Sequence, residues 1–188
     1  MNWKDSIIPF LNNHFTPKKG DHILEVGSSE DLVLKAFTEL GCICTGIELT
    51  QSRVDLANVF MAEEVTAGLV KFINEDIYNI DPEKLENKFD LIILKDVIEH
   101  IHNQEKFINK VGEFLTDDGQ IFFGFPAWRM PCGGHQQCAE SKLMAKFQYD
   151  HLLPMFIYKM LLKLFGEKES VVDGLVEIKE TGISTKRF

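Results

Sequence analysis

The sequence predicts an α/β fold in which a doubly wound, mostly parallel sheet carries helices on both faces. Short apolar segments alternate with segments of helical periodicity between residues 22 and 126. Apolar runs without an in-and-out alternation are typical of parallel strands that are covered on both sides. The chain has 188 residues, of which 45% are hydrophobic and 26% charged, as in a globular protein of one domain.

The elements follow one another in a regular order. An N-terminal helix is predicted over 3–14, and the later helices are placed where apolar residues recur every three or four positions: 31–40, 52–64 and 104–115. Strands are predicted at five apolar segments: 22–27, 42–48, 68–76, 89–96 and 120–126. Each crossover between parallel strands is expected to be right-handed.

The pattern changes after Pro126. The segment 152–165 has 11 apolar residues in 14, which predicts a helix that is buried nearly all round. Beyond it, 171–180 is the best candidate for a further strand, and a poor one. We therefore expect a single domain, 1–188, with an N-terminal helix in 1–20, a ligand-binding core in 21–126 and a C-terminal elaboration that covers the substrate in 127–188.

Charge and composition restrict the classes of partner. The formal net charge of −9 disfavours a nucleic-acid backbone as the ligand. The N-terminus lacks the pattern of a secretory signal, and no apolar run is long enough for a transmembrane helix. We expect a cytoplasmic protein whose four cysteines, at 42, 44, 132 and 138, are thiols.

Carboxylates follow four consecutive predicted strands. In a doubly wound sheet the ligand binds at the carboxyl ends of the strands, so these side chains are expected to face it. Such a series favours a polar and cationic ligand. The residues are Glu25 with Gly27 after the first strand, Glu48 after the second, Asp76 after the third and Asp96 after the fourth.

The first turn, GSSED at 27–31, favours an adenosyl ligand over a dinucleotide. It lacks the G-x-G-x-x-G pattern, and Glu30 and Asp31 would repel a pyrophosphate at the start of the following helix. A ligand with a sulfonium and an ammonium group would not be repelled. Glu48 lies 21 residues after Gly27, the usual distance for a carboxylate that binds ribose hydroxyls.

The sequence resembles the class I S-adenosylmethionine-dependent methyltransferases, in the small-molecule subgroup related to the ubiquinone-pathway O-methyltransferases. The resemblance covers residues 20–126 and rests on ILEVGSS, TGIELT, NEDIYNI, FDLIILKDVIEHI and FLTDDGQIFFGFP. It implies a Rossmann-like fold and S-adenosylmethionine as the cofactor. Because that class usually completes its sheet with an antiparallel pair, we expect this chain to be C-terminally shortened, with the final strands missing.

The resemblance also assigns roles to individual residues. Glu25, Gly27 and Ser29 would line the methionine end of the cofactor, and Ser29 stands where the family usually has glycine. Glu48 would bind the ribose, Asp76 the adenine amino group, and Lys95 would place backbone near the methionine. The cofactor-binding residues implied are Glu25, Gly27, Ser29, Glu48, Leu49, Asp76, Ile77, Lys95 and Asp96.

A second cluster concerns catalysis. Asp96, Glu99 and His100 would share one face of an α-helix, and His135 follows in CGGHQQC beyond the fifth strand. The pattern resembles the E-x-x-E-H…H metal site of small-RNA 2′-O-methyltransferases, with Asp96 in place of a glutamate. Three interpretations remain open. The residues form a solvated helical turn with a histidine that caps nearby backbone, or the four residues bind a divalent metal such as Mn²⁺, Fe²⁺ or Zn²⁺, or His100 and His135 supply a general base. A loop with incidental thiols is preferred over a zinc site at Cys132, His135 and Cys138.

The leading hypothesis for function is methyl transfer from S-adenosylmethionine to a small-molecule or lipid-like acceptor. The alternatives are a non-catalytic adenosyl-ligand-binding protein whose first loop is degenerate at Ser29, and an NAD-dependent oxidoreductase. The apolar run 152–165 would lose part of its cover in a shortened chain, so we also expect self-association through it.

Overall fold

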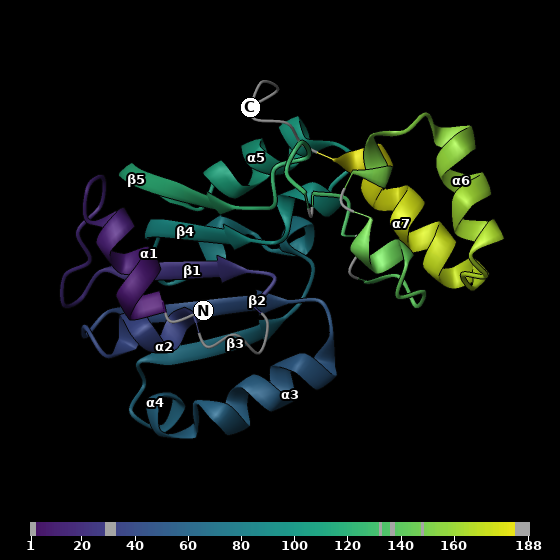
Figure 1. Ribbon diagram of the computed structural model, residues 1–188. Coiled ribbons are helices and arrows are strands. Elements are labelled where there is room, and N and C mark those ends of the chain that lie inside the picture. The colour runs from purple at the N-terminus through teal and green to yellow at the C-terminus, as the bar shows by residue number, and fades with distance from the viewer. Residues whose placement is uncertain (1–2, 29–32, 132, 136–137, 148, 183–188) are drawn as a thin grey trace. The chain divides into compact units, whose positions relative to one another are not determined.

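The computed structural model describes residues 3–28, 33–131, 133–135, 138–147 and 149–182. The chain forms two compact units. The first consists of residues 1–95 and 104–124, and the second of residues 96–103 and 125–188. Figure 1 shows the elements of both units.

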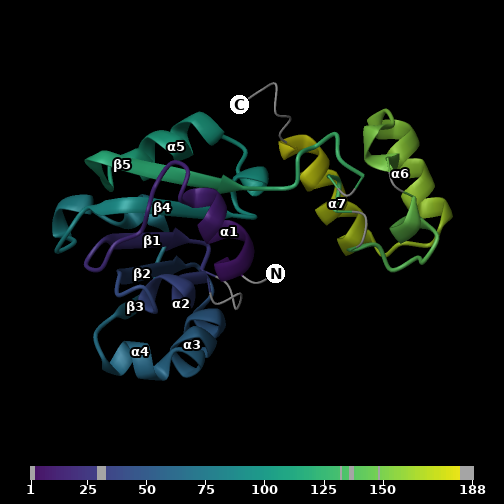
Figure 2. The ribbon, with the colours of Figure 1, turned by 60° about the vertical axis from the view of Figure 1, so that its left-hand side comes forward.

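The first unit is built on a five-stranded sheet whose neighbouring strands are all parallel. The strand order is β3-β2-β1-β4-β5, so the direction of winding reverses between β1 and β4 (Figures 1 and 2). The predicted doubly wound α/β fold is thereby confirmed. The strands are β1 (His22–Val26), β2 (Ile43–Glu48), β3 (Val70–Asn74), β4 (Phe89–Lys95) and β5 (Leu115–Gly124).

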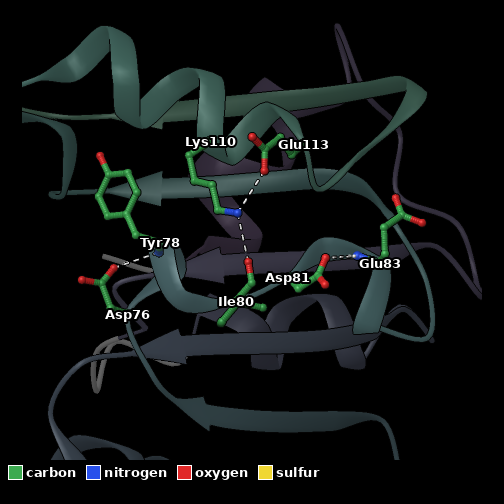
Figure 3. A network of polar contacts seen from close by, with 7 residues as sticks. All are labelled: Asp76, Tyr78, Ile80, Asp81, Glu83, Lys110 and Glu113. Atoms are coloured by element: carbon green, nitrogen blue, oxygen red, sulfur yellow. Dashed lines mark hydrogen bonds and ion pairs between the residues drawn. The ribbon is translucent and has the colours of Figure 1, made fainter.

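Helices cover both faces of this sheet because its strands are apolar on both sides. Side chains of α1 (Trp3–Leu11) and α2 (Val33–Thr38) pack on Ile23, Leu91 and Ile93. Successive strand residues point to opposite faces, so Leu24 and Ile92 require a second layer. That layer includes α5 (Gln104–Gly112), and Figure 3 shows α5 and α1 on opposite sides of the strands.

Two predicted boundaries differ from the structure. The helix expected over 52–64 is divided at Met61 into α3 (Gln51–Phe60) and α4 (Ala62–Thr66), because Met61 leaves helical geometry while its side chain stays in the core. The strand expected from 120 begins at Leu115 instead. Its extra residues are taken up by an irregular register, in which Phe89 pairs with Leu115 and Leu91 with Gln120.

The second unit is helical. Helix α6 (Met155–Leu164) lies where a helix was expected over 152–165, and α7 (Glu169–Thr181) packs beside it. The strand candidate 171–180 is therefore wrong: Val172, Leu175 and Val176 follow helical spacing and form one core with Tyr158 and Leu162. The expected burial nearly all round is wrong, because only the face of α6 that contains Tyr158 and Leu162 is packed on α7, whereas Phe156, Met160 and Leu164 are exposed. Short 3-10 turns complete the unit: η3 (Ile98–His100), η5 (Met144–Lys146) and η6 (Asp150–Leu152).

None of the helices in the described part of the chain combines the length and the apolar character needed to cross a lipid bilayer.

Candidate functional site

The carboxyl ends of β1 and β2 meet at the point where the strand order reverses. Glu25 lies in β1 beside Gly46 of β2 and Ile93 of β4, in the middle of the sheet. Glu48 is the last residue of β2. Both carboxylates are buried, and charged groups are rarely buried without a partner or a ligand. This edge is where doubly wound sheets bind their ligands.

The first turn is shaped by Gly27. Its φ of 73° lies in the left-handed region, which favours glycine. The amides of Gly27 and Ser28 both donate to the carbonyl of Ile47, at 2.9 and 3.2 Å, so the turn folds over the end of β2. The four-residue stretch that follows, with Ser29, Glu30 and Asp31, lies outside the described residues.

Ser28 and Gly46 are site residues that the sequence analysis missed. Ser28 is buried, and a Cβ on Gly46 would lie 2.6 Å from its Oγ and 2.6 Å from a ring carbon of Phe72. Only a glycine leaves room for both side chains. A glycine inside a strand often marks such a close approach, so TGIE contained a signal that could have found this contact.

Glu48 is held in one orientation. Its Oε1 accepts from the amide of Thr50 at 2.8 Å, and its Oε2 lies 3.9 Å from Nη1 of Arg53. Its own carbonyl accepts from Nδ2 of Asn74 on β3 at 2.9 Å. Only 6% of Glu48 is exposed, whereas the next residue, Leu49, is an exposed apolar side chain. The carboxylate oxygens retain lone pairs for further donors such as hydroxyls.

A short loop follows β3 and contains two predicted cofactor residues. Asp76 caps the 3-10 turn η1 (Ile77–Asn79), because its Oδ1 accepts from the amide of Tyr78 at 2.9 Å. Ile77 is buried. A second turn, η2 (Pro82–Lys84), is capped in the same way by Asp81 (Figure 3).

Helix α5 anchors this loop from the other side. Nζ of Lys110 donates to the carbonyl of Ile80 at 3.0 Å and pairs with Glu113 at 2.9 Å (Figure 3). The ring of Tyr78 packs edge-on against Phe107 with centroids 6.2 Å apart. The sequence offered no signal for Lys110, since its main partner is a backbone carbonyl thirty residues earlier.

The second cluster lies just after β4, whose last residue is Lys95, paired in register with Gly124. The α-helical face expected for Asp96, Glu99 and His100 is wrong. Asp96 has a φ of 53° and precedes η3, which is a single 3-10 turn. The turn begins after Asp96. Because a 3-10 helix has 3.0 residues per turn, residues four positions apart do not share a face as they do on an α-helix. Glu99 is buried.

The structure brings His100 and His135 together. Their ring centroids lie 5.6 Å apart at an interplanar angle of 46°. His135 has a φ of 52°, and positive values in residues other than glycine concentrate at functional sites. Burial lowers the pKa of His135, the charge of His100 lowers it further, and Asp96 opposes the shift. Burial and His100 thus both disfavour the protonated form of His135.

The metal hypothesis does not fit this geometry. Within the described residues, no three His, Cys, Asp or Glu side chains are grouped so that they could hold one metal ion. Cys132, of the alternative zinc site, lies outside the described residues. Of the cysteines that the structure describes, Cys42 and Cys44 are buried free thiols, as predicted, and Cys138 is an exposed one.

Comparison with known proteins decides the family. Residues 3–164 match the model of a family described as a methyltransferase domain, which is well over half of the chain. The chain belongs to this methyltransferase family. The predicted resemblance to class I S-adenosylmethionine-dependent methyltransferases is thereby confirmed.

The curated relatives are methyltransferases as well. The ubiquinone biosynthesis O-methyltransferase of Coxiella burnetii is 27% identical over 105 residues, which are 56% of this chain and 43% of the relative. The enzyme of the same name from Histophilus somni is 26% identical over 150 residues, 75% of this chain and 60% of the relative. The chain thus spans about half the length of the curated relatives it matches.

Solved methyltransferases share the fold. The plantazolicin methyltransferase BpumL, in complex with a desmethylPZN analog and SAH, has a TM-score of 0.63 at 12% identity, over 98% of this chain and 58% of BpumL. Coclaurine N-methyltransferase, bound to N-methylheliamine and SAH, has a TM-score of 0.51 at 17% identity, over 63% of this chain and 34% of that one.

Proposed function

We propose that this protein transfers a methyl group from S-adenosylmethionine to a small-molecule or lipid-like acceptor. The observation that carries the proposal is Glu48, a buried carboxylate fixed by Thr50 at the end of β2. A fixed acceptor of this kind binds two vicinal ribose hydroxyls without first losing conformational freedom. Membership of the methyltransferase family supports the same cofactor.

The remaining residues of the first unit fit the cofactor. Glu25, which lies two residues before the Gly27 turn, is a buried carboxylate suited to an ammonium group. The adenine end would lie at Asp76 and Ile77, where Asp76 still has Oδ2 to accept from an amino group. When bound, S-adenosylmethionine supplies the electrophilic methyl group, so the protein has mainly to orient donor and acceptor.

A hydroxyl acceptor also requires a base. We assign this role to His135, because its lowered pKa favours the unprotonated ring, whose nitrogen can take the proton of the hydroxyl. A proton taken up by His135 would be opposed by a charged His100 and favoured by Asp96. The name of the curated relatives, ubiquinone biosynthesis O-methyltransferase, supports a hydroxyl group on a small or lipid-like molecule as the acceptor.

Calorimetry with S-adenosylhomocysteine tests the cofactor site. Glu48→Gln keeps an acceptor oxygen but loses the charge, and a hydrogen bond to a charged group contributes about 1.5–3 kcal/mol. We expect binding to weaken by about tenfold to a hundredfold. Glu83→Gln, an exposed carboxylate in η2, is the matched control and should bind as the unaltered protein does. Equal affinities of the two variants, or tighter binding of NAD than of S-adenosylhomocysteine, would disprove the assignment.

A second experiment separates the enzyme from a non-catalytic binder. Tritium-labelled S-adenosylmethionine is incubated with a simple catechol, and label transfer is measured. We expect transfer by the unaltered protein, and its loss in His135→Gln with cofactor affinity retained. Binding without transfer to any hydroxylated probe would favour the non-catalytic alternative.

A further inference from the structure

Helix α6 has two apolar faces, and only one of them packs against other described residues of its unit. Tyr158 and Leu162 are fully buried against α7, which lies beside α6 in Figures 1 and 2. The opposite face contains Phe156, Met160 and Leu164, one helical turn apart, with exposed fractions of 74%, 58% and 74%. A helix on a protein surface normally turns polar side chains to the solvent.

Lysines border this exposed face. Lys159 and Lys163 are exposed and lie one position before Met160 and Leu164, so they form a parallel row along the apolar stripe. The stretch 141–165 contains two further exposed lysines, Lys142 and Lys146. Its single acidic residue, Asp150, is buried, although the whole chain has a net charge of −9.

Exposed apolar side chains are also concentrated in this stretch. Besides the three on α6, five large hydrophobic residues of 143–165 are exposed, and three of them are aromatic. They are Leu143, Phe147, Tyr149, Leu152 and Phe165. Aromatic and aliphatic side chains next to lysines are typical of helices that lie in a membrane interface.

We propose that α6 is the docking surface of this protein for an anionic lipid membrane. The apolar stripe would enter the boundary between headgroups and acyl chains, while the lysine stems reach back to the phosphates. At ten residues the helix is suited to lie in the interface rather than to span it. A symmetric contact with a second copy is disfavoured, because it would place the lysine row of one copy against the lysine row of the other.

This proposal does not depend on methyl transfer, and it is tested without an activity assay. The protein is sedimented with vesicles of phosphatidylcholine alone or mixed with phosphatidylglycerol. We expect binding to the mixed vesicles that weakens as salt is raised. Each lysine near such a surface contributes about fivefold in affinity, so Lys159→Gln with Lys163→Gln should weaken binding by about 25-fold.

The apolar half of the surface is tested with Phe156→Gln and Leu164→Gln together, which should abolish sedimentation. The matched control is Val59→Gln with Phe60→Gln, two exposed apolar residues of α3 in the first unit, which should bind as the unaltered protein does. Circular dichroism checks that each variant is folded. Equal losses of vesicle binding in the α6 pair and in the α3 pair would overturn the proposal. It would also be overturned if the protein did not bind the mixed vesicles and instead formed a stable dimer in light scattering or bound RNA.

Discussion

Replacing Lys110 by Met tests whether α5 holds the loop after β3 in place. The change removes the ammonium group that donates to the carbonyl of Ile80 and pairs with Glu113, but keeps most of the aliphatic stem. Only 17% of the Lys110 side chain is exposed, so water replaces the lost donor poorly.

The magnitude follows from the two contacts. A hydrogen bond from a charged donor contributes about 1.5–3 kcal/mol, and the lower half of that range applies because Ile80 is only half-buried. The pair with Glu113, whose side chain is 54% exposed, adds about 0.3–0.5 kcal/mol. A loss of about 2 kcal/mol corresponds to a fall of roughly 4–8 °C in the melting temperature of a protein of this size.

Calorimetric melting measures this loss, and hydrogen exchange of residues 76–80 locates it. Lys84→Met is the matched control, since the Lys84 side chain is 82% exposed and lies 4.0 Å from its partner Asp81. Glu113→Gln separates the ion pair from the hydrogen bond and should cost at most about 0.5 kcal/mol. If Lys110→Met and Lys84→Met melt alike, or if exchange rises elsewhere and not in the loop, the reasoning is refuted.

Three further predictions concern titratable groups. Because the pKa of His135 is lowered in the folded state, its contribution to stability is complete above about pH 6.5 and is lost as the pH falls. The decrease in melting temperature that acid causes should therefore be smaller in His135→Gln than in the unaltered protein. Burial raises the pKa of Asp150, so the contribution of Asp150 to stability is lost as the pH rises. Between about pH 4 and pH 8 the melting temperature of Asp150→Asn should therefore rise relative to that of the unaltered protein. A melting temperature that falls further behind over this range would contradict the prediction. Burial raises the pKa of Cys42 to about 11 and that of Cys44 further, so both thiols should react slowly in the folded protein. In a Cys132→Ser protein a disulfide reagent should modify the exposed Cys138 at once and Cys42 and Cys44 only on unfolding, which is measured by counting the free thiols.

The carboxylates at the strand ends show how much of the site is encoded in the local sequence. The apolar strands and the carboxylates that follow them are encoded locally, so the sheet, Glu25, Glu48 and Asp76 could be predicted from the sequence. Their meeting at one edge follows from parallel topology alone, because every parallel strand ends at the same side of the sheet. The contacts that fix them, such as Thr50 on Glu48, involve backbone groups that carry no sequence signal.

The sequence by itself determined the α/β class, the strand-end carboxylates and the buried thiols, since these depend on periodicity and on the residue at the end of each strand. The tertiary structure decided what depends on backbone geometry at single residues or on distant partners. It placed Asp96 outside a helical turn, brought His135 to His100, joined Lys110 to Ile80 and turned 171–180 into a helix. Valine favours strands in isolation. In 171–180, however, the apolar residues at helical spacing pack against α6, and this packing overrides the local preference.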